Sequence, residues 1–265
     1  MIGFKMNILA MIGASVREKN RGILYGAGFF LQVLKNIPEF FRKRQIGYKV
    51  LTMQVLFTGF EALGVIALIS MALGGVIIIQ GISMLSQFLS DNVAYSILIA
   101  VITRELGPIL TAFIIIARSG TAIATEIGGM VVDHQIEAYI STGVNPLSFI
   151  VVPRLFGVTV SLMFLNIYFN IFGLIGSFAV IRLFTRVEIQ NYFRNLMTIL
   201  QPEDIFSALL KSFVFGIIIS MVSTYHGFKV EQSTTEVPVA AIKAVGSSFV
   251  FCVVADIIIT LVYYL

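Results

Sequence analysis

The stretch that decides the fold runs from Arg104 to Arg154 and reads R-E-L-G-P (104–108), A-R-S-G-T-A-I-A-T-E-I-G-G-M (117–130), D-H-Q-I-E-A (133–138), G-V-N-P (143–146) and P-R (153–154). It lies between long apolar runs and partly inside them. Charged residues are costly in lipid and small residues pack weakly against it, so a cluster of both needs a mechanical or transport role. The stretch therefore predicts a functional centre within a membrane protein.

The composition of the whole chain favours the same class. Of its 265 residues, 58% are hydrophobic and 12% are charged, whereas soluble domains average about 25% charged. The net charge of +4 is expected to set membrane topology and not to bind nucleic acid. Cys252 is the single cysteine, so no disulfide and no thiolate metal site can form within one chain.

The N-terminal segment 1–49 is basic and is predicted to lie in the cytoplasm or at the membrane surface. It holds nine of the 18 basic residues: Lys5, Arg17, Lys19, Arg21, Lys35, Arg42, Lys43, Arg44 and Lys49. Cytoplasmic segments of membrane proteins carry such an excess. The apolar run Ile23–Leu34 is shorter than the roughly twenty residues that a span needs. We expect it to form a helix in the membrane interface, with a sixth span as the alternative.

Residues 50–265 are predicted to form an all-α membrane domain with five spans, a cytoplasmic N-terminus and an external C-terminus. We expect spans at about 51–80, from Val93 through R-E-L-G-P, at Leu147–Leu183, up to about Tyr225, and from Lys243 to the C-terminus. Outer segments are expected at Ser86–Asn92 and 185–204. Cytoplasmic loops are expected at Thr125–Pro146, with a short helix around Val131–Ser141, and at His226–Lys243.

Three charged residues are predicted to lie deep in the membrane. Arg104 and Glu105 fall roughly 16 Å into the second span at 1.5 Å per residue, and Asp256 lies at a similar depth in the last span. Adjacent helical residues point about 100° apart, so Arg104 and Glu105 need partners on other spans. Asp256 is the partner that we expect for Arg104. The group can be a structural ion pair or a polar seat for the head group of an amphiphile.

The run 117–138 is predicted to combine close helix packing with a contact surface. Its small residues allow neighbouring helices to approach closely. From Asp133 onward, polar and apolar residues alternate at helical spacing, which is typical of a short amphipathic helix. Such a helix can dock on a soluble partner or lie solvated in a loop. The chain contains no G-x-x-x-x-G-K-[ST], H-E-x-x-H or G-x-S-x-G motif, which predicts neither an enzyme nor a bound cofactor.

The ordered motifs from Arg104 to Arg154 resemble those of the MlaE/YrbE permeases, which belong to ABC transporters that work with MCE-domain proteins. The resemblance continues more weakly through Lys211–Tyr225, His226-Gly227-Phe228 and Asp256. It implies a homodimeric permease in the cell inner membrane, with five spans and an N-terminal interfacial helix per subunit. It also implies three further partners, namely a separate ATPase subunit that binds the ATP, an MCE-domain protein and phospholipid, with a small regulatory subunit as an optional fourth.

The resemblance also implies roles for particular residues. A lipid cavity at the dimer interface would be lined by Ile79, Ile82, Arg104, Glu105 and Leu106, and Asp256 is added as the other deep charge. The segment 125–141 would be the coupling helix seated on the ATPase, with contacts from Glu126, Met130, Asp133, Gln135 and Glu137.

The sequence therefore predicts a permease subunit of an ABC transporter that moves phospholipid or a related lipid between membranes. The alternative is a stand-alone channel or ion-coupled transporter that uses Arg104, Glu105 and Asp256 as a relay. The two differ in whether transport needs a separate ATPase. The sequence gives neither the direction of transport nor the lipid species.

Overall fold

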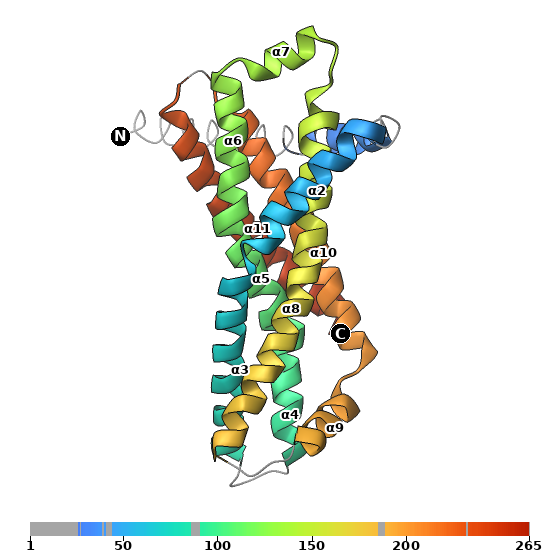
Figure 1. The fold of residues 1–265 in the computed structure, drawn as a ribbon, viewed down its shortest axis with the longest axis vertical. Helices are drawn as coiled ribbons and strands as arrows, with labels where there is room; N and C mark the ends of the chain where they lie inside the picture. Colours follow the sequence, from blue (N-terminus) through green and yellow to red (C-terminus); the bar gives the residue numbers. More distant parts are fainter. Residues whose placement is uncertain are drawn as a thin grey trace, which may run out of the picture.

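The computed structural model describes residues 26, 28–38, 40, 44–85, 91–184, 189–231 and 233–264. Within these ranges the chain is built of helices and contains no strand, which confirms the all-α prediction (Figure 1). Five helical stretches are long and apolar enough to cross a membrane: Leu63–Gln80, Tyr95–Val132, Leu147–Leu183, Pro202–Phe228 and Glu236–Tyr263. The predicted number of spans is therefore confirmed for the described part of the chain.

The labelled elements follow one another with short connections. They are α2 (Arg44–Phe60), α3 (Leu63–Leu85), α4 (Asp91–Ile99), α5 (Gly107–Ile115), α6 (Thr121–Val132), α7 (Gln135–Ser141), α8 (Val152–Phe184), α9 (Ile189–Ile199), α10 (Pro202–Phe228) and α11 (Glu236–Tyr264). Three π-helical segments join them, at Ala100–Leu106, Ile116–Gly120 and Leu147–Val151. Short α7 lies at one end of the elongated molecule and α9 near the other (Figure 1).

The first span begins later than the sequence predicts. In place of one helix over 51–80, the chain turns at Glu61 and Ala62, between α2 and α3. Arg118, from the second span, donates hydrogen bonds to both the backbone carbonyl and the carboxylate of Glu61. Hydropathy carries no sign of this break, because the residues on both sides are apolar.

The second span continues further than the sequence predicts. A cytoplasmic loop was expected from Thr125, but α6 runs to Val132, and only then does the chain turn into α7. The hydroxyl of Thr125 donates to the carbonyl of Thr121 at 2.9 Å, which satisfies a polar side chain inside the helix. Ala124, Ile127 and Gly128 are buried on the same helix. The short helix predicted around Val131–Ser141 is confirmed, with the narrower bounds of α7.

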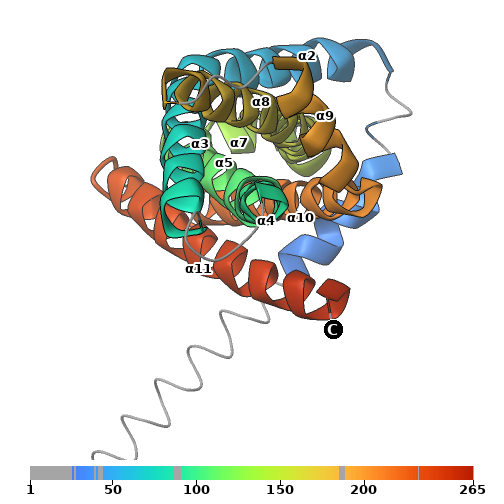
Figure 2. The ribbon, with the colours of Figure 1, turned by 90° about the horizontal axis from the view of Figure 1, so that it is seen from below.

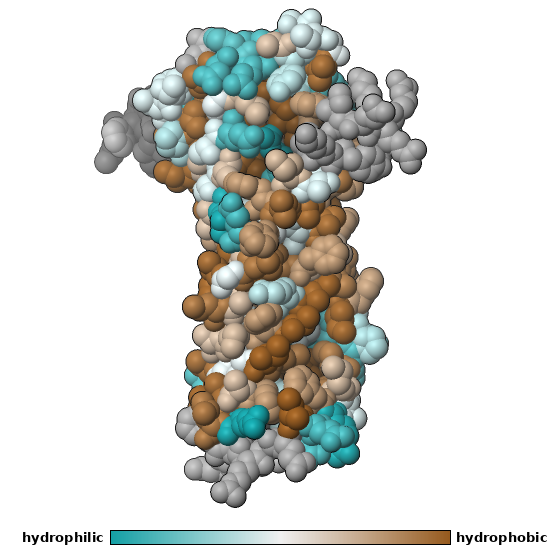
Figure 3. Space-filling view, viewed as in Figure 1, coloured by the Kyte–Doolittle hydropathy of each residue, from teal (hydrophilic) through white to brown (hydrophobic). Residues whose placement is uncertain are grey.

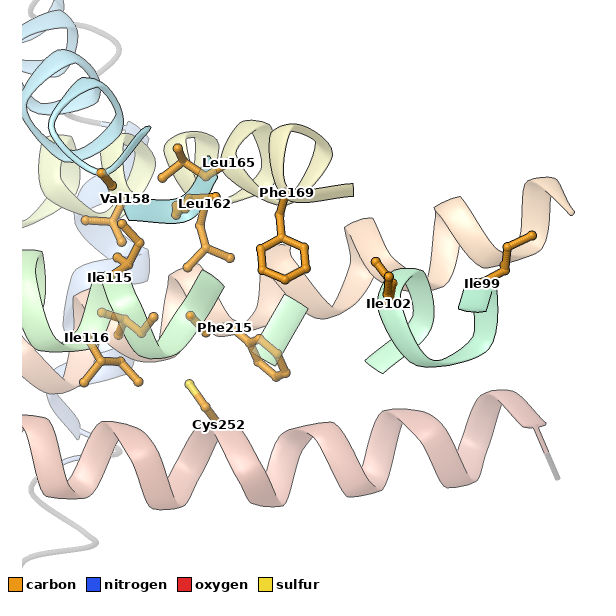
Figure 4. Close-up of a cluster of buried hydrophobic side chains, with 14 of the residues drawn as sticks. Ile99, Ile102, Ile115, Ile116, Val158, Leu162, Leu165, Phe169, Phe215 and Cys252 are labelled. Carbon is orange, nitrogen blue, oxygen red and sulfur yellow. The ribbon is translucent and has the colours of Figure 1, made fainter. Parts of the chain in front are cut away.

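α3 and α8 come into close contact through glycines. A Cβ on Gly74 would overlap the carbonyl of Gly173, and one on Gly176 would overlap the backbone of Met71. Small residues at such a crossing let two backbones come together. This geometry gives these glycines a packing role. Around the crossing, α4, α5, α8, α10 and α11 share an apolar core (Figure 4).

The helix over residues 28–38 packs at the α7 end of the molecule. Val33 and Phe40 are buried against Val151, Val152 and Leu155. Six of the basic residues counted in segment 1–49, and most of the outer segment 86–92, lie outside the described residues; the six are Lys5, Arg17, Lys19, Arg21, Arg42 and Lys43.

At the opposite end, α9 is held by one buried tyrosine. The ring of Tyr192 packs against Tyr95 and Phe178, and its hydroxyl lies 2.5 Å from that of Ser177. Burial raises the pKa of Tyr192 to about 12, so the hydroxyl stays protonated. Residues 189–199 of the segment expected outside the membrane thus form a helix packed on the spans. Seen from below, α11 and α2 lie on opposite sides of the bundle (Figure 2).

Candidate functional site

A cluster of five charged residues lies within the spans, and Lys211 is at its centre. We call Arg104, Glu105, Asp204, Lys211 and Asp256 the charged cluster. The side chain of Lys211 is 0% exposed, and its Nζ lies 2.7 Å from Glu105 Oε2 and 3.0 Å from Asp256 Oδ1. A buried ammonium is costly unless it is paired and hydrogen-bonded. The two carboxylates supply that pairing from two other helices.

The backbone around Pro108 supplies a third partner for Lys211. Proline has no N–H, so Pro108 cannot donate to the carbonyl of Arg104 four residues earlier. This carbonyl accepts a hydrogen bond from Lys211 Nζ at 3.1 Å. Pro108 directly follows the π-helical segment that contains Arg104 and Glu105. The R-E-L-G-P motif thus shapes a backbone that accepts a side chain from α10.

Gly107 in the same motif lets α8 approach. A Cβ at this position would lie 2.8 Å from the carbonyl of Ile102 and 2.9 Å from Asn166 Oδ1. Both distances are too short for a side chain, so glycine is required here.

The partner of Arg104 differs from the one that the sequence predicts. Arg104 was expected to pair with Asp256, but its Nε lies 2.7 Å from Asp204 Oδ1, while Asp256 pairs with Lys211. Asp204 also accepts a hydrogen bond from the backbone N–H of Gln201, as part of a capping box at the start of α10. Sequence analysis placed Asp204 in an outer loop, because its position next to Pro202 and Glu203 suggested a polar connection.

The charged cluster is open on one side. The side chains of Arg104 and Glu105 are 31% and 39% exposed. Beside Asp256, α11 exposes the apolar side chains of Ile257 and Ile258. The arrangement places hydrogen-bonding and charged groups next to an apolar surface, which suits a molecule with a polar head and a hydrocarbon tail. Among the described residues no group of three His, Cys, Asp or Glu is placed to hold a metal ion.

The other residues predicted for the lipid cavity lie near this cluster in sequence or on α3. Leu106 follows Glu105 in the π-helical segment and is half-buried. Ile79 is exposed on α3. Ile82 is also in α3, but its side chain is outside the described part of the structure. The assignment of these three residues to lipid stays a prediction.

The predicted coupling residues lie along α6 and α7. Glu126 Oε1 is 2.7 Å from Nη2 of Arg154, so an ion pair joins α6 to the start of α8. Met130 is half-buried one turn later. Asp133, Gln135 and Glu137 are exposed at the turn between α6 and α7 and on α7 itself. These last three face solvent, so they are free to contact another molecule.

His134 shapes the turn from α6 into α7. Its backbone has φ of 57° in the left-handed region, which few residues other than glycine, Asn, Asp and His adopt. Its Nδ1 pairs with the carboxylate of Glu137. Gly143, after α7, has φ of 76° and reverses the chain toward α8.

Three residues of these sites were missed by sequence reasoning, and each left a signal. Lys211 is the lone lysine within the apolar run Pro202–Phe228, so its position deep in a predicted span was enough to indicate a site residue. Arg154 closes the motif stretch but was not given a role. Asp204 has the spacing of a capping box with Gln201, which would have placed it inside a helix.

Comparison with known proteins identifies relatives over most of the chain. Residues 51–262 match the family model described as Permease MlaE. A probable ABC transporter permease of Rickettsia prowazekii is 30% identical over 211 residues, covering 80% of this chain and 82% of that protein. The protein TRIGALACTOSYLDIACYLGLYCEROL 1 of Arabidopsis thaliana is 28% identical over 222 residues, covering 84% and 63%. A Haemophilus influenzae protein named intermembrane phospholipid transport system permease protein MlaE is 26% identical over 255 residues, covering 92% and 96%.

Proposed function

Because this chain belongs to the MlaE permease family, we propose that it is the membrane-spanning subunit of an ABC transporter that moves phospholipid between membranes. A separate ATPase subunit supplies the energy. The relative from Haemophilus influenzae, whose name states intermembrane phospholipid transport, supports this choice of substrate. The relatives named ABC transporter permeases support the need for an ATPase.

The observation that carries the proposal is the charged cluster around Lys211. A phospholipid has a charged head and two hydrocarbon tails, and its head cannot rest against apolar side chains alone. The exposed edges of Arg104 and Glu105 offer ionic and hydrogen-bonding partners inside the spans. The buried Lys211 holds Glu105 in place. The apolar face of α11 would receive the tails.

Energy would reach this cluster through α6 and α7. In the proposal, the ATPase binds the exposed residues of α7 and pushes on α6 when it closes around ATP. Since α6 is continuous with the helical column that carries Arg104, its movement changes the width of the lipid site. The continuity of Tyr95–Val132 supports this route.

The assembly would contain two copies of the chain. Only 11% of the most apolar part of α11 is buried within one copy. An apolar face of this size is available for a second copy as well as for lipid. We propose that the α7 end faces the cytoplasm of the inner membrane and that α9 faces the outside, where an MCE-domain protein would receive or deliver lipid. A small regulatory subunit would act on the ATPase.

The lipid site can be tested with a photocrosslinking residue at position 106. In the native background it should capture phospholipid, identified by mass spectrometry of the purified protein. The double substitution Arg104→Leu with Asp204→Asn removes the exposed guanidinium without leaving a buried carboxylate unpaired. It should reduce the captured phospholipid several-fold, while Arg182→Leu, an exposed arginine near the end of α8, should not.

Undiminished capture in the double variant would contradict the lipid site. The ion-coupled alternative predicts something different, namely transport by the purified chain alone in response to an ion gradient. ATP-dependent lipid movement that requires a second subunit would exclude that alternative.

A further inference from the structure

A pocket separate from the charged cluster lies between α2, the second half of α6, α7 and the start of α8. Its volume is about 780 Å³, within the range of small-molecule sites. Most of its wall is apolar and comes from α2, α6, α7 and the segment before α8. The wall includes Leu56, Phe57, Phe60, Met130, Tyr139 and Phe149. The pocket is therefore suited to a hydrocarbon chain.

One cation lines this apolar wall, and it is incompletely paired. The side chain of Arg154 is 7% exposed, and its Nη2 contacts Glu126 Oε1 at 2.7 Å. The Nε and Nη1 atoms of Arg154 have no hydrogen-bond partner among the described residues. A guanidinium presents five N–H donors and is most stable when paired with an acceptor that bridges two nitrogens. A buried guanidinium that is held by a single carboxylate oxygen can accommodate a further anionic group.

Glu126 occupies the position that such an anion would take. Its side chain is 55% exposed, so it can swing into solvent at little cost. A phosphate or carboxylate in its place would use one oxygen for Nη2 and a second for the adjacent Nη1, in the bidentate geometry that arginine favours. The apolar pocket wall would then hold the attached hydrocarbon chain.

We propose that this pocket binds an anionic amphiphile, with its acidic head on Arg154 in exchange for Glu126 and its tail along α2. The source is an anionic lipid of the membrane leaflet at the α7 end. None of the pocket residues belongs to the charged cluster, so this is a second site. In Figure 3, polar and apolar surfaces meet at the upper part of the molecule, where α2 and α7 lie.

Occupancy of the pocket would bear on coupling, and this consequence rests on the proposed function. Glu126, Met130 and Tyr139 belong to the segments proposed to transmit movement from the ATPase. An anion on Arg154 would release Glu126 and so detach α6 from the start of α8. Binding itself requires no ATPase and no transport, so it can be measured on the purified chain whether or not the proposed function holds.

The chain has no tryptophan, which allows a single fluorescent reporter in the pocket. Phe57→Trp places the indole on the pocket wall. The protein would be held in phosphatidylcholine nanodiscs, and phosphatidylglycerol with brominated acyl chains, which quench indole fluorescence, would be added in steps. We expect saturable quenching at low fractions of the anionic lipid. Brominated phosphatidylcholine should quench only in proportion to its amount.

Two test variants and one control variant give the comparison. Arg154→Gln should weaken the apparent affinity for the anionic lipid about tenfold or more, whereas Lys243→Gln, which removes an exposed cation of α11, should leave it unchanged. Glu126→Gln removes the competing carboxylate and should strengthen binding a few-fold. This second variant decides the question if Arg154→Gln does not fold.

The proposal is overturned if the two brominated lipids quench alike, or if Glu126→Gln leaves the affinity unchanged or weaker. Inorganic phosphate that displaced the lipid with equal affinity would also overturn it, because the site would then recognise the free anion and not the amphiphile.

Discussion

At the residue scale, the stability of the molecule depends on how a few charged side chains are paired inside the apolar spans. Lys211 is stabilised by two carboxylates and by the backbone carbonyl of Arg104. This carbonyl receives no N–H from position 108, because residue 108 is proline. Arg104 is held by Asp204, which also caps α10. Each charge is thus supported by a structural feature of the helix that faces it. Removing one charged residue should destabilise the protein, because its partners would stay buried without a counter-charge.

We predict that Lys211→Met destabilises the protein by about 3 kcal/mol, because two carboxylates lose their cation in a partly buried setting. Adding Glu105→Gln and Asp256→Asn to the same variant should restore most of the loss. Unfolding can be followed with a thiol-reactive dye in detergent, since Cys252 is buried in the folded protein and is the single cysteine. Equal stability of the wild type and Lys211→Met would show that the cluster is not a stabilising ion group.

The depth of Arg104, Glu105 and Asp256 could be predicted from their places in apolar runs, but their pairing could not. Pairing depends on how three helices are rotated about their axes, and hydropathy does not fix rotation. The same limit explains the mistaken partner for Arg104. Arg154 shows a further limit, because its burial and missing hydrogen bonds arise from packing of α2, α6 and α8.

At the scale of elements, close helix crossings and helix breaks decide the shape. The glycines of α3 and α8 could be predicted to pack, because small residues in apolar helices have few other uses. The break at Glu61 was not predictable, since it depends on a hydrogen bond from the distant Arg118. The extension of α6 to Val132 was missed for a local reason. Polar residues such as Thr125 were interpreted as a loop, although their hydroxyls can bond within the helix.

We predict that Gly176→Ala destabilises the protein by about 1–3 kcal/mol or more, because the added methyl group would overlap the backbone of α3 at Met71. Gly64→Ala is the matched control, since a Cβ at Gly64 meets no atom within 4 Å. It should be neutral or stabilise by about 0.5–1 kcal/mol through helix propensity. Thermal unfolding of both variants, followed at Cys252, would measure the difference. Similar melting temperatures would contradict the close crossing.

We predict that Glu126→Gln together with Glu137→Gln uncouples ATP hydrolysis from lipid transport in the assembled transporter. Glu126 joins α6 to α8, and Glu137 is exposed on α7, so both lie on the proposed route of coupling. Transport should fall several-fold while ATP hydrolysis continues. Glu231→Gln, an exposed carboxylate in the connection between α10 and α11, should leave both rates unchanged. Full transport in the double variant would remove these residues from the coupling route.

At the scale of the whole molecule, five spans place the helix 28–38 and α7 at one end and α9 at the other (Figure 1). The number of spans could be predicted because length and hydropathy suffice for it. The proposed sidedness rests on the basic N-terminal segment, through the positive-inside bias. The lipid site is proposed between these ends, where the charged cluster lies, and the second copy is proposed to contact the exposed faces of the spans.

Sidedness can be measured with single cysteines in a Cys252→Ser background. We predict that Gln190→Cys, exposed on α9, reacts with a membrane-impermeant maleimide in right-side-out membrane vesicles. Ser141→Cys, exposed at the end of α7, should react only after the membrane is permeabilised. The opposite pattern would invert the proposed topology and exclude an ATPase on the α7 side.

The proposal that this chain is a phospholipid permease driven by a separate ATPase can be tested by purifying the protein from its native membrane in mild detergent and analysing proteins and lipids together by mass spectrometry. We expect recovery of an ATP-binding subunit, an MCE-domain protein and phospholipid enriched over the surrounding membrane. Recovery of the chain alone, with neither ATPase nor enriched phospholipid, would contradict it.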